Sequence, residues 1–218
     1  MTPWTCQGDL AGSPREATVL TVLDGVLDPA TCRALIEEID EEEQSWLTTT
    51  AELTRHAVGL FSAPPHRALD SARPCRLQGL DTRPHFAAVD DPILALRLFY
   101  RLTPHLPESL RGAPLAGIKP LLRCIHLGAG EATEAHHDPI RESQDGMRSG
   151  LSLALFLNDD FRGGALTFPE IGRVIEARAG RAVLFSQHLL HGDALVERGD
   201  RYLLEGEIFY APSWRPYR

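Results

Sequence analysis

The chain has 218 residues, 43% hydrophobic and 24% charged, a balance typical of a globular protein with one large core. Its formal net charge of −8 disfavours nucleic acid and anionic membrane surfaces as partners. The sequence contains no apolar stretch long enough to span a bilayer and opens on no secretory signal. The 4 scattered cysteines lack C-x-x-C spacing and fit free thiols in a reducing compartment, so we expect a cytoplasmic protein.

The first part of the chain predicts one strand and two helices. Residues 17–23, ATVLTVL, are typical of a short strand. A helix follows, with Asp28 as N-cap and Pro29 at its first position. The apolar face of this helix consists of Leu35, Ile36 and Ile39. The second helix begins after Asp91 and ends before Pro104.

Residues 61–85, between these helices, are rich in proline and arginine and show little periodicity. This segment is either a surface connection or a lid over a pocket, since long loops in compact domains are often functional. From residue 119, short apolar runs separated by turn signals predict a β-sandwich or barrel. We therefore expect a single domain over 1–218, mostly β, with helical support in 1–118 and a β-rich core in 119–211.

Residues 131–142, EATEAHHDPIRE, contain two adjacent histidines and an aspartate. Proline favours an extended conformation in the residue before it, and an extended segment sends alternate side chains to opposite sides. His136 and Asp138 are then expected to point one way and His137 the other. A histidine and a carboxylate on one side are two of the three ligands of a 2-His-1-carboxylate metal site.

A second His-x-Asp motif lies at residues 191–193, but no histidine follows it. A metal site that opened on this motif would lack its second histidine. The motif at 136–138 has two histidines downstream that could complete it, His188 and His191. The spacing alone leaves both open.

Several segments, in order, extend this pattern: VLDGVLDPATCRALIEEI (22–39), GAGEATEAHHD (128–138), LFLNDDFRGGALTFPE (155–170), ARAGRAVLF (177–185) and HGDALVERGDRYLLEGEIFYA (191–211). Together they resemble the iron(II)/2-oxoglutarate dioxygenase superfamily, and specifically its prolyl 4-hydroxylase-like branch. The resemblance covers most of the chain apart from the loop at 61–85. It implies a double-stranded β-helix, or jelly-roll, core.

The resemblance also implies a set of site residues. His136, Asp138 and His191 would bind Fe(II). In this family a basic residue ten positions after the distal histidine binds the C5 carboxylate of 2-oxoglutarate, which here is Arg201. Arg198 has the same spacing from the alternative histidine, but the flanking residues of the family motif fit Arg201, and Arg198 lies in a predicted turn.

The implied reaction consumes Fe(II)-activated O2 and 2-oxoglutarate, releases succinate, and hydroxylates an unactivated C–H bond of an amino-acid-like, peptidyl or small natural-product substrate. A same-fold oxygenase that desaturates or closes rings is the first alternative. Halogenation is disfavoured because halogenases of this superfamily lack the carboxylate ligand, which is present here as Asp138. The alternative from another class is a catalytically silent β-sandwich that only binds.

One position departs from the family pattern. Many relatives have a tyrosine that touches the cosubstrate where this chain has Leu127. We expect His126 or Thr167 to supply the missing contact, with an ordinary strand histidine as the alternative for His126.

Charged residues near these motifs predict substrate contacts. Strand alternation from Arg201 places Glu205 and Glu207 on its side, unless a bulge turns them to solvent. We predict that Glu207 meets a cationic group of the substrate at the pocket mouth, because a buried unpaired carboxylate is costly. Arg141 and Arg148 follow the metal motif and either bind a substrate carboxylate or are solvated loop charges.

Overall fold

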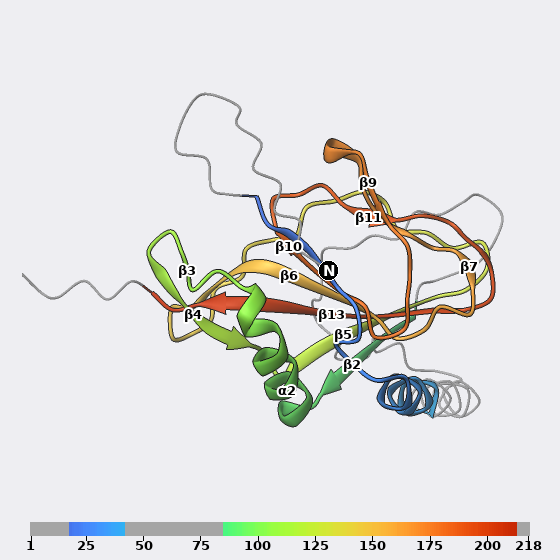
Figure 1. The fold of residues 1–218 in the computed structure, drawn as a ribbon, viewed down its shortest axis with the longest axis horizontal. Coiled ribbons are helices and arrows are strands. Elements are labelled where there is room, and N and C mark those ends of the chain that lie inside the picture. Colours follow the sequence, from blue (N-terminus) through green and yellow to red (C-terminus); the bar gives the residue numbers. More distant parts are fainter. Residues whose placement is uncertain (1–17, 42–84, 213–218) are drawn as a thin grey trace, which may run out of the picture.

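The computed structural model describes residues 18–41 and 85–212 (Figure 1). The predicted lid or connection at 61–85 lies outside the described residues, except for its last position. Among the described helices, none is both long enough and apolar enough to cross a membrane.

Both predicted helices are present. The first covers residues 29–41 in its described part, and α2 spans Pro92–Leu102. The N-cap aspartates, Asp28 and Asp91, each accept hydrogen bonds from the backbone N–H groups two and three residues later, at 2.8–3.1 Å. These contacts satisfy N–H groups that have no partner within the helix, which explains why both helices begin where the sequence predicts. A short 3-10 turn, Thr103–His105, ends the second helix at its proline.

The main antiparallel sheet has the order β1-β10-β6-β13-β4-β3, with β5 paired to β13 and β2 paired to β5. Its strands are β1 (Leu20–Leu23), β2 (His85–Asp90), β3 (Ser109–Leu110), β4 (Ala113–Ile118), β5 (Leu121–Leu127), β6 (Arg148–Phe156), β10 (Ala182–Ser186) and β13 (Arg201–Tyr210). Smaller sheets join β8 (Leu166–Phe168) to β9 (Arg173–Ile175) and β11 (Gly192–Asp193), and β7 (Arg162–Gly163) to β12 (Val196–Arg198).

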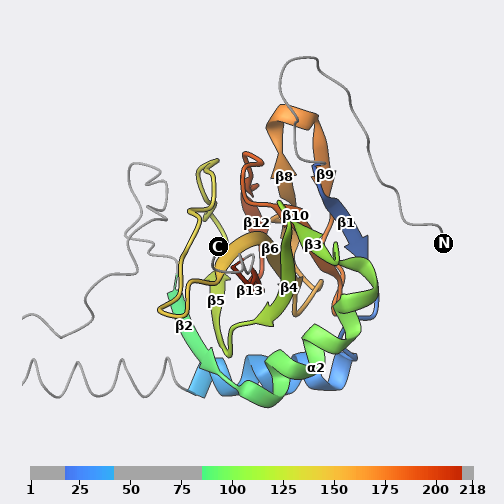
Figure 2. The ribbon, with the colours of Figure 1, turned by 90° about the vertical axis from the view of Figure 1, so that its left-hand side faces the viewer.

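The curled sheets form the jelly-roll core that the sequence predicted (Figures 1 and 2). Residues 85–118, predicted only as helical support, also contribute three strands to it. β4 pairs with the end of β13, and β2 forms the edge beyond β5. The sequence of β4, APLAGI, contains proline and glycine, which weaken the strand pattern that would have announced it.

Strands β6 and β13 are buried on both faces, which separates two cores. Both helices lie under the outer face of the main sheet (Figure 2). The outer core joins these helices to the sheet through Leu35, Ile39, Leu94, Leu98, Leu151, Leu153, Leu155 and Leu204. The inner core, between the sheets, contains Ala154, Phe156, Leu166, Phe168, Val183, Phe185 and Leu203. Each fully buried leucine or phenylalanine contributes about 1.5–3 kcal/mol, so the alternation along these strands fixes which side chains face the barrel interior.

Candidate metal centre

Two histidines that are far apart in the sequence lie side by side through their backbones. The N–H of His136 donates to the carbonyl of His191 at 2.8 Å, and the N–H of His191 donates back at 3.0 Å. This isolated antiparallel bridge brings the two ring centroids to 4.5 Å. The segment before β6 is thereby fixed against the segment before β11.

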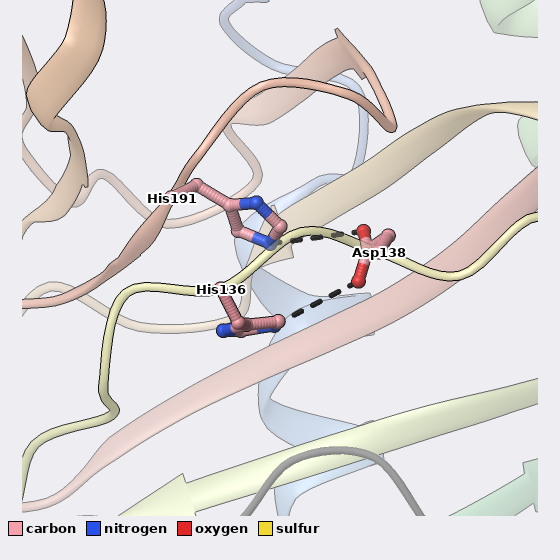
Figure 3. Close-up of side chains that lie close together, drawn as sticks. All are labelled: His136, Asp138 and His191. Atoms are coloured by element: carbon pink, nitrogen blue, oxygen red, sulfur yellow. Dashed lines mark ion pairs between the residues drawn. The ribbon is translucent and has the colours of Figure 1, made fainter.

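Asp138 completes a cluster with these histidines (Figure 3). Nε2 of His136 lies 3.7 Å from Asp138 Oδ1, and Nε2 of His191 lies 3.7 Å from Oδ2. One ligand atom from each residue lies within 4.8 Å of the others. These separations are too long for direct hydrogen bonds but suit three ligands that share one cation.

Both imidazoles are oriented by backbone carbonyls. Nδ1 of His136 lies 2.9 Å from the Glu134 carbonyl oxygen, and Nδ1 of His191 lies 3.0 Å from that of Leu189. A carbonyl oxygen only accepts hydrogen bonds, so the hydrogen of each neutral ring must be on Nδ1. Nε2 then has its lone pair directed toward Asp138, as a metal ligand requires.

The carboxylate is also held in place. The Ser152 hydroxyl donates a hydrogen bond to Oδ2 of Asp138, from the strand beside it. On the other side, the Phe185 ring lies 4.6 Å and the Phe168 ring 6.1 Å from the ring of His191. This apolar wall limits the access of water to the buried histidine.

The neighbouring histidines stay outside the cluster. His137 is exposed, as the predicted alternation requires. His188 is exposed too, and its Nε2 lies 3.4 Å from the hydroxyl oxygen of Thr18. Of the two candidates that the spacing left open, the structure therefore brings His191 to the site. Within residues 18–41 and 85–212, this trio is the one group of three or more acidic, histidine or cysteine side chains close enough to hold a metal.

Arg201 lies inside the barrel at the start of β13, with its side chain fully buried. Its Nη2 donates to Asp193 Oδ1 at 2.6 Å, and the Thr133 hydroxyl donates to Oδ2 of the same aspartate at 2.9 Å. Its Nε and Nη1 are buried without a hydrogen-bond partner among the described residues. Buried donors without acceptors are costly, so this guanidinium is suited to an additional anionic acceptor such as a carboxylate.

The surroundings of Arg201 are shaped to hold it. Its guanidinium carbon lies 5.2 Å from the ring centroid of Phe156, and Leu127 is its pairing partner across β5. A Cβ at Gly164 would lie 2.9 Å from Cδ of Arg201, so a larger residue there would displace the arginine. Arg198, by contrast, is exposed in β12.

The model of the 2OG-Fe(II) oxygenase superfamily matches residues 121–207, the segment that contains the histidine–aspartate cluster and Arg201. Over this segment the chain is similar to the superfamily. Its members use Fe(II), 2-oxoglutarate and O2, so the protein is a dioxygenase. The donor set described above fits both the metal and a dicarboxylate cosubstrate.

Solved structures show the same fold at low sequence identity. A collagen prolyl hydroxylase of Paramecium bursaria Chlorella virus 1 has a TM-score of 0.59 and 14% identity over 88% of this chain and 96% of that chain. A Pseudomonas putida prolyl-4-hydroxylase has a TM-score of 0.55 and 16% identity over 88% and 92%. A Trichoplax adhaerens prolyl hydroxylase, in complex with a hypoxia-inducible-factor peptide fragment, has a TM-score of 0.53 and 15% identity over 87% and 83%. No curated protein matches the chain in sequence.

His126 was one of two residues predicted to contact the cosubstrate in place of the family tyrosine. His126 pairs with Tyr202, the neighbour of Arg201 on β13, and so lies on the opposite face of the sheet. Its ring stacks on that of Tyr202 at 4.3 Å, and its Nε2 lies 3.0 Å from Asp200 Oδ1. Strand alternation thus turns His126 away from the side of the sheet that holds Arg201.

Thr167, the second residue predicted for that role, lies in β8. Its neighbours Leu166 and Phe168 point into the inner core, so its own side chain points the other way. Its hydroxyl donates to the carbonyl of Gly192 at 2.9 Å and so stabilises the pairing of β8 with β11. Leu127, where relatives have a tyrosine, faces Arg201 with an apolar side chain and is fully buried.

The two glutamates of β13 do face inward, as strand alternation predicts. Glu205 pairs with Arg123 of β5, and Oε1 of Glu207 lies 2.8 Å from Nε of Arg141. The irregularity in the pairing of β13 with β6 lies beyond them, between residues 208 and 209, so the alternative of solvent-facing glutamates is wrong. The two candidate substrate contacts, Arg141 and Glu207, form an ion pair with each other.

Electrostatics in this part of the barrel are dominated by burial. Burial raises the pKa of Glu205, and the attraction of Arg123 offsets only part of the effect. Burial likewise raises the pKa of Glu207 despite its contact with Arg141. Arg148, the first residue of β6, differs from these residues, since it is exposed and pairs with Glu142 at 3.2 Å.

Sequence reasoning missed several residues that shape the site. Asp193 was considered only as part of a failed metal motif, yet it is the partner of Arg201. Its two-residue spacing from His191 was the signal available. Ser152 and Arg123 lie in apolar strands where no local pattern distinguishes a site residue, and only the pairing of β13 with its neighbours brings them to the centre.

Proposed function

We propose that the protein is an Fe(II)/2-oxoglutarate-dependent hydroxylase in which His136, Asp138 and His191 bind the iron. Arg201 binds the C5 carboxylate of 2-oxoglutarate. The enzyme oxidises an unactivated C–H bond of an amino-acid-like, peptidyl or small natural-product substrate. The observation that supports this most strongly is the convergence of two imidazole Nε2 atoms and one carboxylate in a barrel that also buries an arginine with two unfilled donors.

The residues around the metal centre have separate tasks in this proposal. Bound Fe(II) supplies the activation of O2, while the protein positions the reactants and excludes water. The Ser152 hydroxyl fixes the orientation of Asp138, and backbone carbonyls fix both imidazoles. Arg201 anchors the far end of the cosubstrate at the closed end of the barrel.

A peptidyl substrate stays within the proposed class. One solved structure with this fold is a collagen prolyl hydroxylase, and another holds a peptide fragment. The ion pair of Arg141 and Glu207 favours the amino-acid-like members of the class.

The proposal is tested by replacing the ligands one at a time. His136→Ala, Asp138→Ala and His191→Ala should each abolish Fe(II)-dependent decarboxylation of 2-oxoglutarate and weaken iron binding, because each removes one of three protein ligands. His137→Ala is the matched control, since this histidine is exposed beside the site. Iron content and succinate formation are measured for all four variants. Loss of the metal in His137→Ala with retention in His136→Ala would show that the proposed register is wrong by one residue.

A further inference from the structure

Gln187 is a buried polar side chain that the proposed reaction does not use. It is 3% exposed, and its Nε2 has no hydrogen-bond partner among the described residues. Its Oε1 lies 3.0 Å from the hydroxyl of Ser149. That hydroxyl accepts the backbone N–H of Arg141 at 2.8 Å, so its own hydrogen is free to go to Gln187 Oε1. The amide is therefore oriented with its NH2 group directed away from Ser149.

This amide belongs to a network at the edge of the metal centre. Ser149 is tied twice to Arg141, because its backbone N–H also donates to the Arg141 carbonyl at 2.9 Å. The side chain of Arg141 pairs with Glu207. Glu207 is the pairing partner of Ser152 across β6 and β13, and Ser152 holds Asp138. The network thus borders the metal ligands on the side away from Arg201.

The network presents both charges and an unfilled donor. The side chains of Glu207 and Arg141 are 24% and 39% exposed, so a ligand can reach them without unfolding the chain. An amide donor that is buried and unsatisfied costs free energy unless a ligand accepts from it. A molecule that has both an anionic and a cationic group can approach an Arg–Glu pair without leaving either charge uncompensated.

We propose that Gln187, together with the Arg141–Glu207 pair, forms the substrate-recognition subsite, and that the substrate is a free amino-acid-like zwitterion. A carboxylate oxygen of the substrate accepts from Gln187 Nε2 and lies beside Arg141, while its ammonium group pairs with Glu207. A segment inside a peptide would fill the amide donor through a carbonyl but would bring no cation to Glu207. This inference rests on the proposed function and narrows its substrate class.

The test compares Gln187→Leu with Gln144→Leu, which alters a glutamine in an exposed turn. The probes are the proteinogenic L-amino acids, each beside its N-acetyl derivative and its amide. Succinate formation is one readout. Protection against thermal unfolding, with Mn(II) in place of Fe(II) and 2-oxoglutarate present, is the other and does not depend on turnover. Gln187→Glu is a second variant, because it keeps the shape of the side chain and places a negative charge where a substrate carboxylate should bind.

At least one free amino acid should stimulate succinate formation and protect the enzyme, and its N-acetyl derivative should do neither. Gln187→Leu and Gln187→Glu should raise the KM for that amino acid roughly 10- to 100-fold and leave the KM for 2-oxoglutarate unchanged. Gln144→Leu should behave as the wild type.

Two results would overturn the inference: no free amino acid stimulates or protects, or both Gln187 variants keep the KM within about twofold of the wild type. Iron-dependent turnover of 2-oxoglutarate that disappears in His136→Ala would leave the proposed function intact in either case. Absence of that turnover in the wild type would refute the proposed function itself.

Discussion

The two ends of the barrel interior, both lined by β13, each hold an arginine beside a carboxylate, but they differ in what is left over. At the inner end Arg201 is 0% exposed, pairs with Asp193, and keeps two buried nitrogens without a partner among the described residues. At the outer end the side chains of Glu205 and Glu207 are 22% and 24% exposed, and each faces its own arginine. The inner arginine therefore has two hydrogen-bond donors left for a ligand, whereas each outer carboxylate has an arginine of its own.

This difference corresponds to two kinds of binding. A buried guanidinium with unfilled donors is preorganised for one anion, because folding has already ordered and desolvated the side chain before the ligand binds. Partly exposed ion pairs can exchange partners with a ligand that carries both charges, which favours discrimination over affinity. We interpret the inner end as the place of the constant cosubstrate and the outer end as the place of the variable substrate.

The largest expected effect comes from removing the inner arginine. Arg201→Ala deletes a buried charge partner and should cost about 2–5 kcal/mol of 2-oxoglutarate binding, or roughly 30-fold to several-thousand-fold in affinity. Arg198→Ala is the control, because Arg198 is exposed and should hardly change the binding. Titration of 2-oxoglutarate into each variant measures the effect. Equal losses in both variants would remove the distinction between the two ends.

The partner of that arginine should matter for stability more than for affinity. Asp193→Asn keeps an oxygen near Nη2 of Arg201 but leaves the buried guanidinium without its counter-charge, so the free energy of unfolding should fall by about 3 kcal/mol. The carboxylate of 2-oxoglutarate then becomes the compensating charge, and the cosubstrate should raise the Tm more in the variant than in the wild type. Asp145→Asn, in an exposed turn, is the control. Equal shifts in Tm for all three proteins would contradict a role for Asp193 in charge compensation.

The inner end could be predicted from the sequence, and the reason is local. The spacing from His136 to Asp138 lies within one extended segment, where alternation decides the side to which each residue points. The spacing from His191 to Arg201 crosses β11, β12 and the turn before β13, so it was recognised only from the family pattern. The choice between His188 and His191 needed the family pattern. The backbone bridge between His136 and His191 now gives it a physical basis.

The outer end could not be predicted in the same way. Arg123 meets Glu205 only because β5 pairs with β13 in one register, and Arg141 reaches Glu207 from a loop that Ser149 holds. The predicted contacts of His126 and Thr167 followed from nearness in sequence to a motif, and a motif does not reveal the face of the strand on which a residue lies. Register and loop anchoring depend on the whole barrel, so a short pattern does not encode them.

Ser152, which contacts Asp138, should affect the affinity for the metal. Ser152→Ala removes the hydroxyl that orients Asp138, and a lost outer contact of this kind weakens metal affinity by roughly tenfold. Ser186→Ala is a matched control, because this buried serine accepts the backbone N–H of Val19 at 2.9 Å and does not touch the cluster. Competition of each variant with a chelator for Fe(II) measures the change. An unchanged affinity in Ser152→Ala would show that the carboxylate is positioned by its backbone alone.

The smallest expected effect is the loss of charge at Glu207. Glu207→Gln keeps the shape of the side chain, so uncoupled turnover of 2-oxoglutarate should survive, while the KM of an amine-bearing substrate should rise about fivefold, as for a partly exposed ion pair.

The pH dependence of the substrate KM gives a sharper test. Burial raises the pKa of Glu207, so the wild-type carboxylate loses its charge as the pH falls through that raised pKa, and the substrate KM should rise there. The variant has no charge to lose at this position, and its KM should lack that rise, although groups on the substrate titrate equally in both proteins. The ratio of the two KM values should therefore approach one at low pH and reach its full value only above the raised pKa. A ratio that stays constant with pH would mean that the Glu207 charge does not meet the substrate, and the outer end would then bind it through shape and neutral hydrogen bonds.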